Sequence, residues 1–132
     1  MATIKSFTDL PQSKVFAEFL PLESADMGYI PSADDDDGNT LYTAEFKSEF
    51  IFDEDCCIPC WSLAALLEEM PEIINFDGDK SVYALEILKE GGLYYLSYGN
   101  LLGRSRIEIE PQECFVDACY EMIIKLHEQK LL

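Results

Sequence analysis

The sequence predicts an α+β protein: a small antiparallel sheet of the β-meander type, with about three helices packed mainly on one face. Residues 81–98 alternate apolar and polar side chains on both sides of Gly91-Gly92, which is the pattern of a β-hairpin with a two-residue turn. Residues 113–129 repeat apolar side chains every three or four positions, which is typical of an amphipathic helix. With 132 residues, 48% of them hydrophobic, the chain can form one domain with a substantial core.

The first half of the chain predicts two helices and one strand. Thr8, Asp9 and Gln12 form a capping-box pattern that opens a helix, and Pro21 ends it. Residues 31–40 carry a run of four aspartates followed by Gly-Asn, which repel one another and favour turns, so we expect a solvated, mobile loop. Residues 41–52 alternate like a strand that is interrupted near residue 48, and residues 61–70 have the apolar stripe of a core-facing helix.

The second half predicts the meander and the last helix. A turn at Gly91-Gly92 places Ile87 opposite Leu96 on one face of the hairpin, and Leu88 and Tyr95 on the other. The same turn places Lys89 opposite Tyr94 and Leu85 opposite Tyr98. Residues 104–110 alternate as a third strand, and residues 113–129 form the last helix. The order predicts a single domain over residues 1–132, with the acidic loop as its most mobile part.

The net charge is −17 and is unevenly distributed. Residues 1–79 contain eighteen acidic side chains and three lysines, a net charge of −15, whereas residues 80–132 have a net charge of −2. The electric field of this concentrated negative charge repels nucleic acid backbones and anionic lipids. We therefore expect neither direct nucleic acid binding nor membrane association. It favours a cationic protein surface as the partner, with divalent ions or simple solubility as alternatives.

The chain has five cysteines, which leave two chemical alternatives open. Cys57-Ile58-Pro59-Cys60 is a CxxC motif before the middle helix, but the three acidic residues upstream disfavour a thiolate. With Cys114 and Cys119 the same pair supplies four thiols for zinc, but a spacing of five on a helix separates those two by about 140°. A thiol redox or zinc-binding protein therefore remains an alternative, and we expect no metal and no cofactor.

No catalytic constellation is visible. His127 is the only histidine, which leaves no partner for a histidine-based triad or metal pair. The aspartate run fails the EF-hand pattern, because with Gly38 at the sixth position the first and twelfth positions are Ala33 and Ala44. Asp26 and Asn100 are polar residues without an assigned role and keep an enzyme under consideration. Because none of these patterns is complete, we expect no catalytic residues.

The compartment is predicted from what the sequence lacks. The N-terminal ten residues contain no apolar run of signal-peptide length, and no apolar stretch approaches the roughly 18 residues that span a membrane. An odd number of cysteines without an export signal favours reduced thiols. The sequence therefore predicts a cytoplasmic protein.

Three stretches carry a resemblance to a known group: residues 22–27 (LESADM), 59–67 (PCWSLAALL) and 117–128 (DACYEMIIKLHE). Together they resemble small uncharacterised proteins encoded in prophages and other mobile elements of anaerobic gut bacteria. The resemblance spans most of the chain, and it implies no activity and no site residues because the group has no established activity. It implies a small accessory protein that acts on a host or phage protein.

The function expected from these observations is binding to another macromolecule rather than catalysis. One version is an acidic DNA mimic, in which carboxylates imitate the phosphate array and occupy a DNA-binding protein. The other is an apolar interface with a protein partner, with association between copies of the chain also possible. The candidate binding residues are the carboxylates on or beside the middle helix and two residues of the mixed hairpin face: Asp53, Glu54, Asp55, Glu68, Glu69, Glu72, Leu88 and Tyr95.

Overall fold

The computed structural model describes residues 5–76, 81–100 and 103–132. Contacts within the chain divide it into two compact units. The N-terminal unit is Ser6–Ala65, and the C-terminal unit is Lys5 with the described part of residues 66–132. Each unit is described below by itself, and the single domain expected from the sequence stays a prediction.

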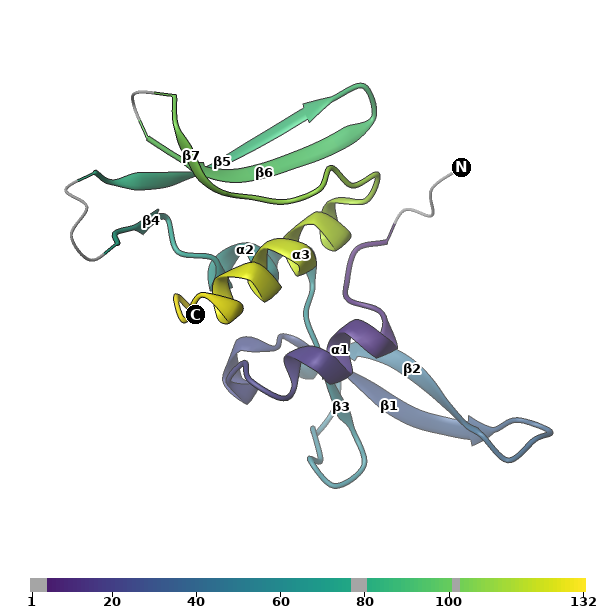
Figure 1. The fold of residues 1–132 in the computed structure, drawn as a ribbon. Helices are drawn as coiled ribbons and strands as arrows, with labels where there is room; N and C mark the ends of the chain where they lie inside the picture. Colours follow the sequence, from purple (N-terminus) through teal and green to yellow (C-terminus); the bar gives the residue numbers. More distant parts are fainter. Residues whose placement is uncertain (1–4, 77–80, 101–102) are drawn as a thin grey trace. The chain divides into compact units, whose positions relative to one another are not determined.

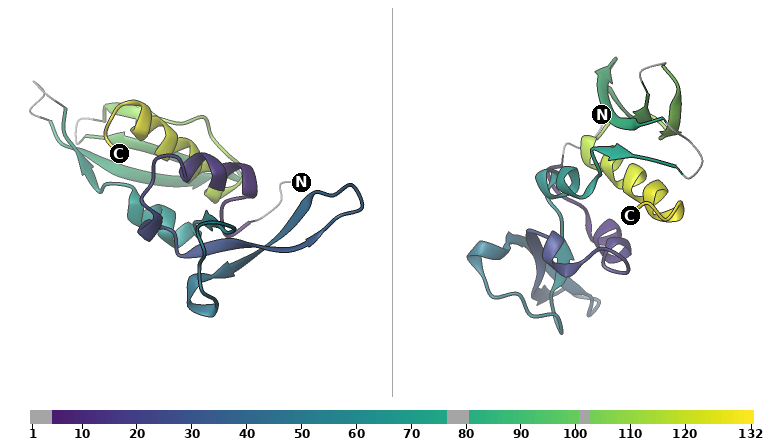
Figure 2. Two further views of the ribbon diagram at one scale, coloured as in Figure 1. Left: turned by 90° about the horizontal axis from the view of Figure 1, so that it is seen from below. Right: turned by 90° about the vertical axis from the view of Figure 1, so that its left-hand side faces the viewer.

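The predicted α+β class is confirmed, with one difference in the sheet (Figures 1 and 2). The described residues form two antiparallel sheets of three and four strands rather than one meander. The order along the chain is α1 (Leu10–Phe16), η1 (Leu22–Ser24), β1 (Met27–Asp34), β2 (Thr40–Phe46), η2 (Lys47–Glu49), β3 (Ile58–Cys60), α2 (Leu63–Glu69), β4 (Ile73–Ile74), β5 (Tyr83–Glu90), β6 (Leu93–Gly99), β7 (Ser105–Glu108) and α3 (Phe115–Glu128).

The three-stranded sheet of the N-terminal unit corrects the prediction of a loop over residues 31–40. β1 continues to Asp34 and pairs with β2 on one side and β3 on the other. The turn is stabilised by Asp35, whose carboxylate accepts hydrogen bonds from the main-chain amides of Asp37 and Asn39 at 2.9 and 2.8 Å. The hydrogen bonds to Asn39 are the main reason that the pKa of Asp35 is lowered. The aspartate run therefore forms the end of β1 and the turn of a hairpin, and the expected mobility of this segment stays a prediction.

The segment after β2 is fixed by aromatic packing on a glycine. The short helix η2 ends the strand near residue 48 as predicted, but residues 50–52 do not resume it. Instead, the rings of Phe50 and Phe52 lie so close to Gly28 that an added Cβ would come within 2.8–2.9 Å of them. Lys47 lies over the ring of Phe52 at 4.8 Å and donates a hydrogen bond to the carbonyl of Leu22 at 2.9 Å.

α1 opens with the predicted capping box, in which Asp9 is the N-cap and exchanges hydrogen bonds with Gln12. Thr8 is not the cap but a fully buried residue. Its hydroxyl lies 2.8 Å from that of Ser13 and accepts a hydrogen bond from the main-chain N–H of Trp61 at 3.1 Å. This polar pair joins the start of α1 to the end of β3 inside the N-terminal unit.

The C-terminal unit has the hairpin register that the sequence predicts. Ile87 lies opposite Leu96 and Leu88 opposite Tyr95, with Lys89–Tyr94 and Leu85–Tyr98 in the same register. Gly91 and Gly92 have φ values of 61° and 79°, and glycine adopts such positive values in a two-residue turn without strain. β7 pairs with β6 as the predicted third strand, and β4, which the sequence did not reveal, pairs with Tyr83 and Ala84 at the start of β5.

The core of this unit lies between one sheet face and α3 (Figure 1). Leu96, Tyr98 and Ile107 are nearly inaccessible to solvent, as are the residues of α3 at helical spacing: Val116, Ala118, Cys119, Met122, Ile123 and Leu126. The rings of Tyr94 and Phe115 stack with centroids 4.8 Å apart. The prediction that the last helix covers the meander is therefore confirmed, whereas α1 packs against β3 of the other sheet.

Candidate interaction surface

One face of the four-stranded sheet points away from α3, and we call it the outer face. Residues of β5 and β6 alternate between the two faces, so Leu88 and Tyr95 project together from the outer face as a cross-strand pair. Leu88 is 54% exposed and Tyr95 is 39% exposed. Both are candidate residues from the sequence, and the structure brings them together.

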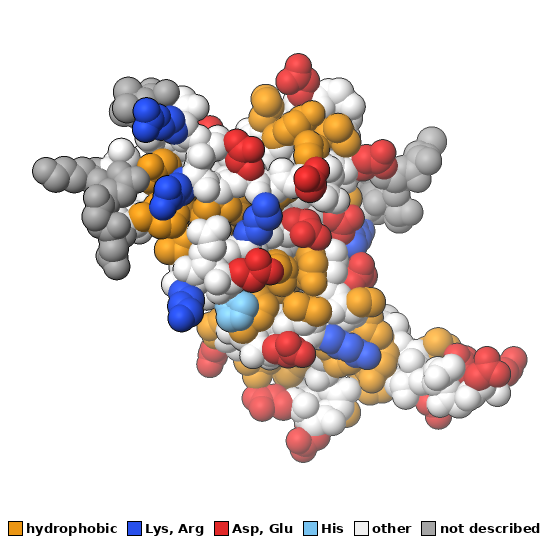
Figure 3. Space-filling model, viewed as in Figure 1, with side chains coloured by type: hydrophobic (Ala, Val, Ile, Leu, Met, Phe, Trp, Pro, Cys, Tyr) orange, Lys and Arg blue, Asp and Glu red, His pale blue; other side chains and the backbone are white. Residues whose placement is uncertain are grey.

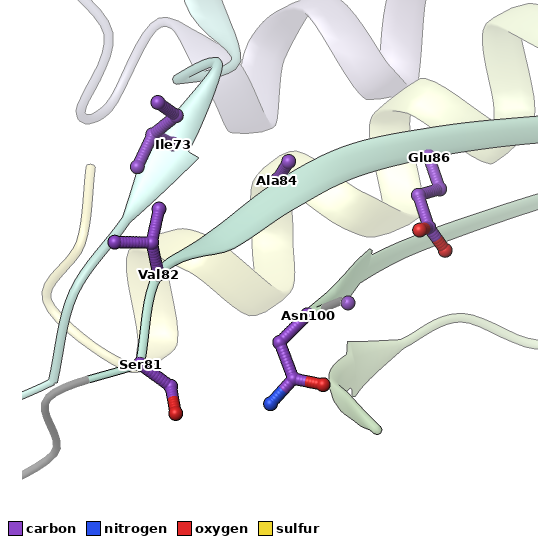
Figure 4. Close-up of a pocket in the computed structure, with 7 residues that line it drawn as sticks. Ile73, Ser81, Val82, Ala84, Glu86 and Asn100 are labelled. Carbon is purple, nitrogen blue, oxygen red and sulfur yellow. The ribbon is translucent and has the colours of Figure 1, made fainter. Parts of the chain in front are cut away.

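A hollow of about 520 Å³ lies farther along the same face (Figure 4). Ile73 of β4 and Val82, which precedes β5, line one side and are 53% and 50% exposed. Glu86 supplies the charge, and its carboxylate lies over Gly99, where an added Cβ would be 3.0 Å from Oε2. The remaining lining residues are Ser81, Ala84 and Asn100. The hollow is thus an apolar depression with one carboxylate on its wall.

The charged residues of the outer face are mainly acidic. Glu86 and Glu90 flank Leu88 along β5, and Glu108 of β7 pairs with Ser97 on the same face. Figure 3 shows hydrophobic and acidic side chains side by side at the β5–β6 hairpin. This combination suits a partner that is both apolar and basic.

The six carboxylates predicted as an array belong to different units. Asp53, Glu54 and Asp55 are exposed and lie in the N-terminal unit, between η2 and β3. Glu68, Glu69 and Glu72 belong to the C-terminal unit, where burial raises the pKa of Glu69. Each unit therefore contains three of the six carboxylates, and the DNA mimic stays a prediction.

The CxxC motif does not lead directly into a helix, which corrects the sequence interpretation. Cys60 ends strand β3, and α2 begins three residues later. The Cys60 thiol is buried beside Thr8, and burial raises its pKa. Because a raised pKa disfavours the thiolate, the position lacks the activation that thiol redox chemistry needs.

Among the described residues, no three His, Cys, Asp or Glu side chains are grouped so as to hold a metal ion. Cys57 and Cys60 lie in the N-terminal unit, and Cys114 and Cys119 lie in the C-terminal unit. Both members of the second pair are buried, and burial raises the pKa of Cys119 to about 12. Cys114 is thus buried at the N-cap of α3, and Cys119 is buried within the helix.

We expect thiol-modifying reagents to distinguish these cysteines. Cys56 is the exposed one, and a hydrogen bond with the Cys57 thiol contributes most to raising its pKa to about 11. Iodoacetamide at neutral pH should therefore label Cys56 first and slowly, and should reach Cys60 and Cys119 only after unfolding. Mass spectrometry of peptides after timed labelling measures this order, with Cys56→Ser as the control. Labelling of Cys119 as fast as Cys56 in the native protein would contradict the described packing.

The two polar residues without an assigned role have structural partners. Asp26 accepts hydrogen bonds from the main-chain N–H and the hydroxyl of Ser62, at 2.9 and 2.5 Å, and the Ser62 hydroxyl in turn accepts one from the N–H of Ala65 in α2. The side-chain oxygen of Asn100 accepts a hydrogen bond from the N–H of Arg104 at 3.1 Å. Asp26 thus holds the start of α2, and Asn100 stabilises the β6–β7 connection.

Sequence reasoning identified part of the outer face and missed the rest. Leu88 and Tyr95 follow from the hairpin register, whereas Ile73 and Val82 were not recognised. β4 has only two residues, too few for an alternating pattern. The sequence does contain β-branched residues at both positions, but their exposure is visible only in the structure.

Comparisons with known proteins identify no relative. No protein family model matches the chain, and neither a curated protein nor a solved structure matches it significantly. Within the part of the chain that the structure describes, no helix has the length and apolar character needed to cross a bilayer.

Proposed function

We propose that this protein is a non-catalytic binding protein that recognises another protein through the outer face of its four-stranded sheet. The observation that supports this best is the Leu88–Tyr95 pair, which stays exposed opposite the face that packs on α3. Exposed apolar and aromatic residues that adjoin each other within a polar rim are typical of protein interfaces.

The proposed partner is a basic protein segment with apolar side chains. An apolar side chain fits the hollow beside Ile73 and Val82, and a lysine or arginine of the partner meets Glu86 on its wall. The net charge of −17 attracts a basic partner to the protein as a whole, and Glu86, Glu90 and Glu108 favour such a partner at the outer face. A small accessory protein that acts on a host or phage protein in the cytoplasm fits this description and the resemblance to mobile-element proteins.

Selection from a library of random peptides displayed on phage tests this function. We expect the selected peptides to combine basic and apolar residues, and Leu88→Lys or Tyr95→Ala to weaken their binding by about tenfold or more, as for a buried contact at an interface centre. Leu41→Lys is the matched control, because Leu41 is 48% exposed but lies on β2 of the other sheet. Fluorescence anisotropy of labelled peptides measures the affinities.

Two outcomes would count against the proposal. One is a selection that yields no binding peptides. The other is a set of peptides whose affinity is the same for Leu88→Lys and for Leu41→Lys. If instead the protein displaces DNA from a basic DNA-binding protein, and charge-neutral replacement of Asp53, Glu54 and Asp55 abolishes this effect, the DNA mimic is the better account.

A further inference from the structure

In the part of the chain that the structure describes, one edge of the four-stranded sheet is left open along most of β5. β5 runs from Tyr83 to Glu90, but its neighbour β4 pairs only with Tyr83 and Ala84. One further hydrogen bond joins the N–H of Leu85 to the carbonyl of Glu72 at 3.0 Å. Among the described residues, the remaining five residues of β5 therefore have a neighbouring strand, β6, on one side only.

Hydrogen bonds elsewhere in the sheet show which main-chain groups face this open edge. Tyr94 exchanges two main-chain hydrogen bonds with Gln112, and the carbonyl of Leu96 accepts one from the N–H of Ile109. These partners lie on the side of β6 that faces away from β5. In the register of the hairpin, Tyr94 and Leu96 lie opposite Lys89 and Ile87. In an antiparallel ladder such pairs do not bond to each other, so the N–H and C=O groups of Ile87 and Lys89 point outward.

These outward groups are available for pairing. The structure records no hydrogen bond from the described residues 5–76, 81–100 and 103–132 to the main chain of Ile87 or Lys89. Both residues are exposed, and Ile87 is 45% exposed although it is apolar. An unpaired edge of this length is a template for another strand.

We propose that the basic partner segment binds as an extended strand added to the β5 edge, pairing with the main-chain groups of Ile87 and Lys89. This inference rests on the proposed function and specifies its geometry. Side chains of an added strand alternate between the two faces, so those on the outer face lie beside Glu86, Leu88 and Glu90. The segment that fits places basic residues beside the two glutamates and an apolar residue beside Leu88.

A second copy of the chain is a poorer occupant of the same edge. Two-fold antiparallel pairing that uses both outward residues centres on Leu88, and it places Glu86 of one copy opposite Glu90 of the other. Each copy also has a net charge of −17, so the approach itself is unfavourable. The charges favour a basic segment of a different protein.

Amide hydrogen exchange provides the first test, and the probe is a capped peptide that carries lysine, valine and lysine at alternate positions, so that these three side chains lie on one face of the added strand. In the free protein, the amides of Ile87 and Lys89 should exchange faster than those of Glu86 and Leu88, which bond to β6. At saturating peptide, exchange at Ile87 and Lys89 should slow by about tenfold or more, because both amides become hydrogen-bonded. Unchanged exchange at both residues under saturation would overturn the proposal.

Matched substitutions provide the second test. Lys89→Pro removes one outward N–H, and edge strands tolerate proline at such a position, whereas Lys89→Ala keeps the N–H and removes the side chain. We expect Lys89→Pro to weaken peptide binding by about tenfold and Lys89→Ala by less than about threefold. A peptide with N-methylated main-chain amides on its bonding edge should also fail to bind, which keeps the test valid if the proline variant unfolds.

The outcomes separate this inference from the function on which it rests. If Leu88→Lys weakens binding but Lys89→Pro and peptide N-methylation do not, the outer face binds its partner without strand addition. If Leu88→Lys also has no effect, both proposals fail. Equal binding of the same peptide with glutamate in place of its two lysines would reject the selection by Glu86 and Glu90. A stable dimer in sedimentation without peptide would identify a second copy as the occupant.

Discussion

Replacing Trp61 with alanine should lower the free energy of unfolding by about 3–5 kcal/mol. Trp61 is fully buried in the N-terminal unit, and its ring packs edge-on against that of Phe16 with centroids 5.6 Å apart. Its indole N–H donates a hydrogen bond to the hydroxyl of Ser24 at 2.9 Å. Alanine removes the ring contacts and leaves a cavity, so both packing and burial are lost. Urea unfolding followed by circular dichroism measures the change.

Trp61→Phe and Ser24→Ala separate the two contributions. Phenylalanine keeps most of the buried ring and should cost less than alanine. Ser24→Ala keeps the ring but removes the acceptor of the buried indole N–H, which should cost about 1–3 kcal/mol. If Trp61→Ala changes the stability no more than Trp61→Phe does, the indole is not packed as described.

Replacing Leu96 with alanine should cost about 2–5 kcal/mol. Leu96 is 1% exposed on the face of β6 that packs on α3, whereas Leu88 on the adjacent strand is 54% exposed on the opposite face. Leu88→Ala is therefore a matched control that removes the same atoms from a solvated position, and it should cost less than about 1 kcal/mol. Met122→Ala in α3 should resemble Leu96→Ala, because Met122 is also fully buried.

The same urea experiment measures all three variants. Equal losses for Leu96→Ala and Leu88→Ala would mean that the assignment of the two sheet faces is wrong. A large loss for Leu88→Ala alone would place the outer face in the core and would also remove the basis of the proposed interaction surface.

The sequence predicted the hairpin and the last helix well because each has a strong local signal. Gly91-Gly92 permits a tight turn, and once the turn is placed the period of two sets every cross-strand pair. The apolar residues of α3 recur at helical spacing over fourteen residues, which is an equally clear signal. The register placed Leu88 and Tyr95 on one face, so the central pair of the candidate surface was predictable from sequence.

The missed strands have physical explanations. β1 contains Pro31, which normally argues against a strand, but the register shifts between Pro31 and Ala33, and such an irregularity tolerates proline. β3 and β4 have three and two residues, too few for a period. The division into two sheets was not predictable either, because an alternating pattern shows which face is buried and not which strands pair.

The packing of Phe50 and Phe52 on Gly28 has an electrostatic consequence for the residues that follow. The carbonyl of Asp53 accepts hydrogen bonds from the amides of Cys56 and Cys57, and its carboxylate accepts one from the amide of Asp55. Residues 53–55 therefore follow Phe52, whose ring packs on Gly28, and lead into a hydrogen-bonded turn, although they lie outside any helix or strand. The main chain that carries three consecutive negative charges is thus held in one conformation, and the Asp53 carboxylate is held by its hydrogen bond, so that the field of this segment has a defined origin on the surface of the N-terminal unit.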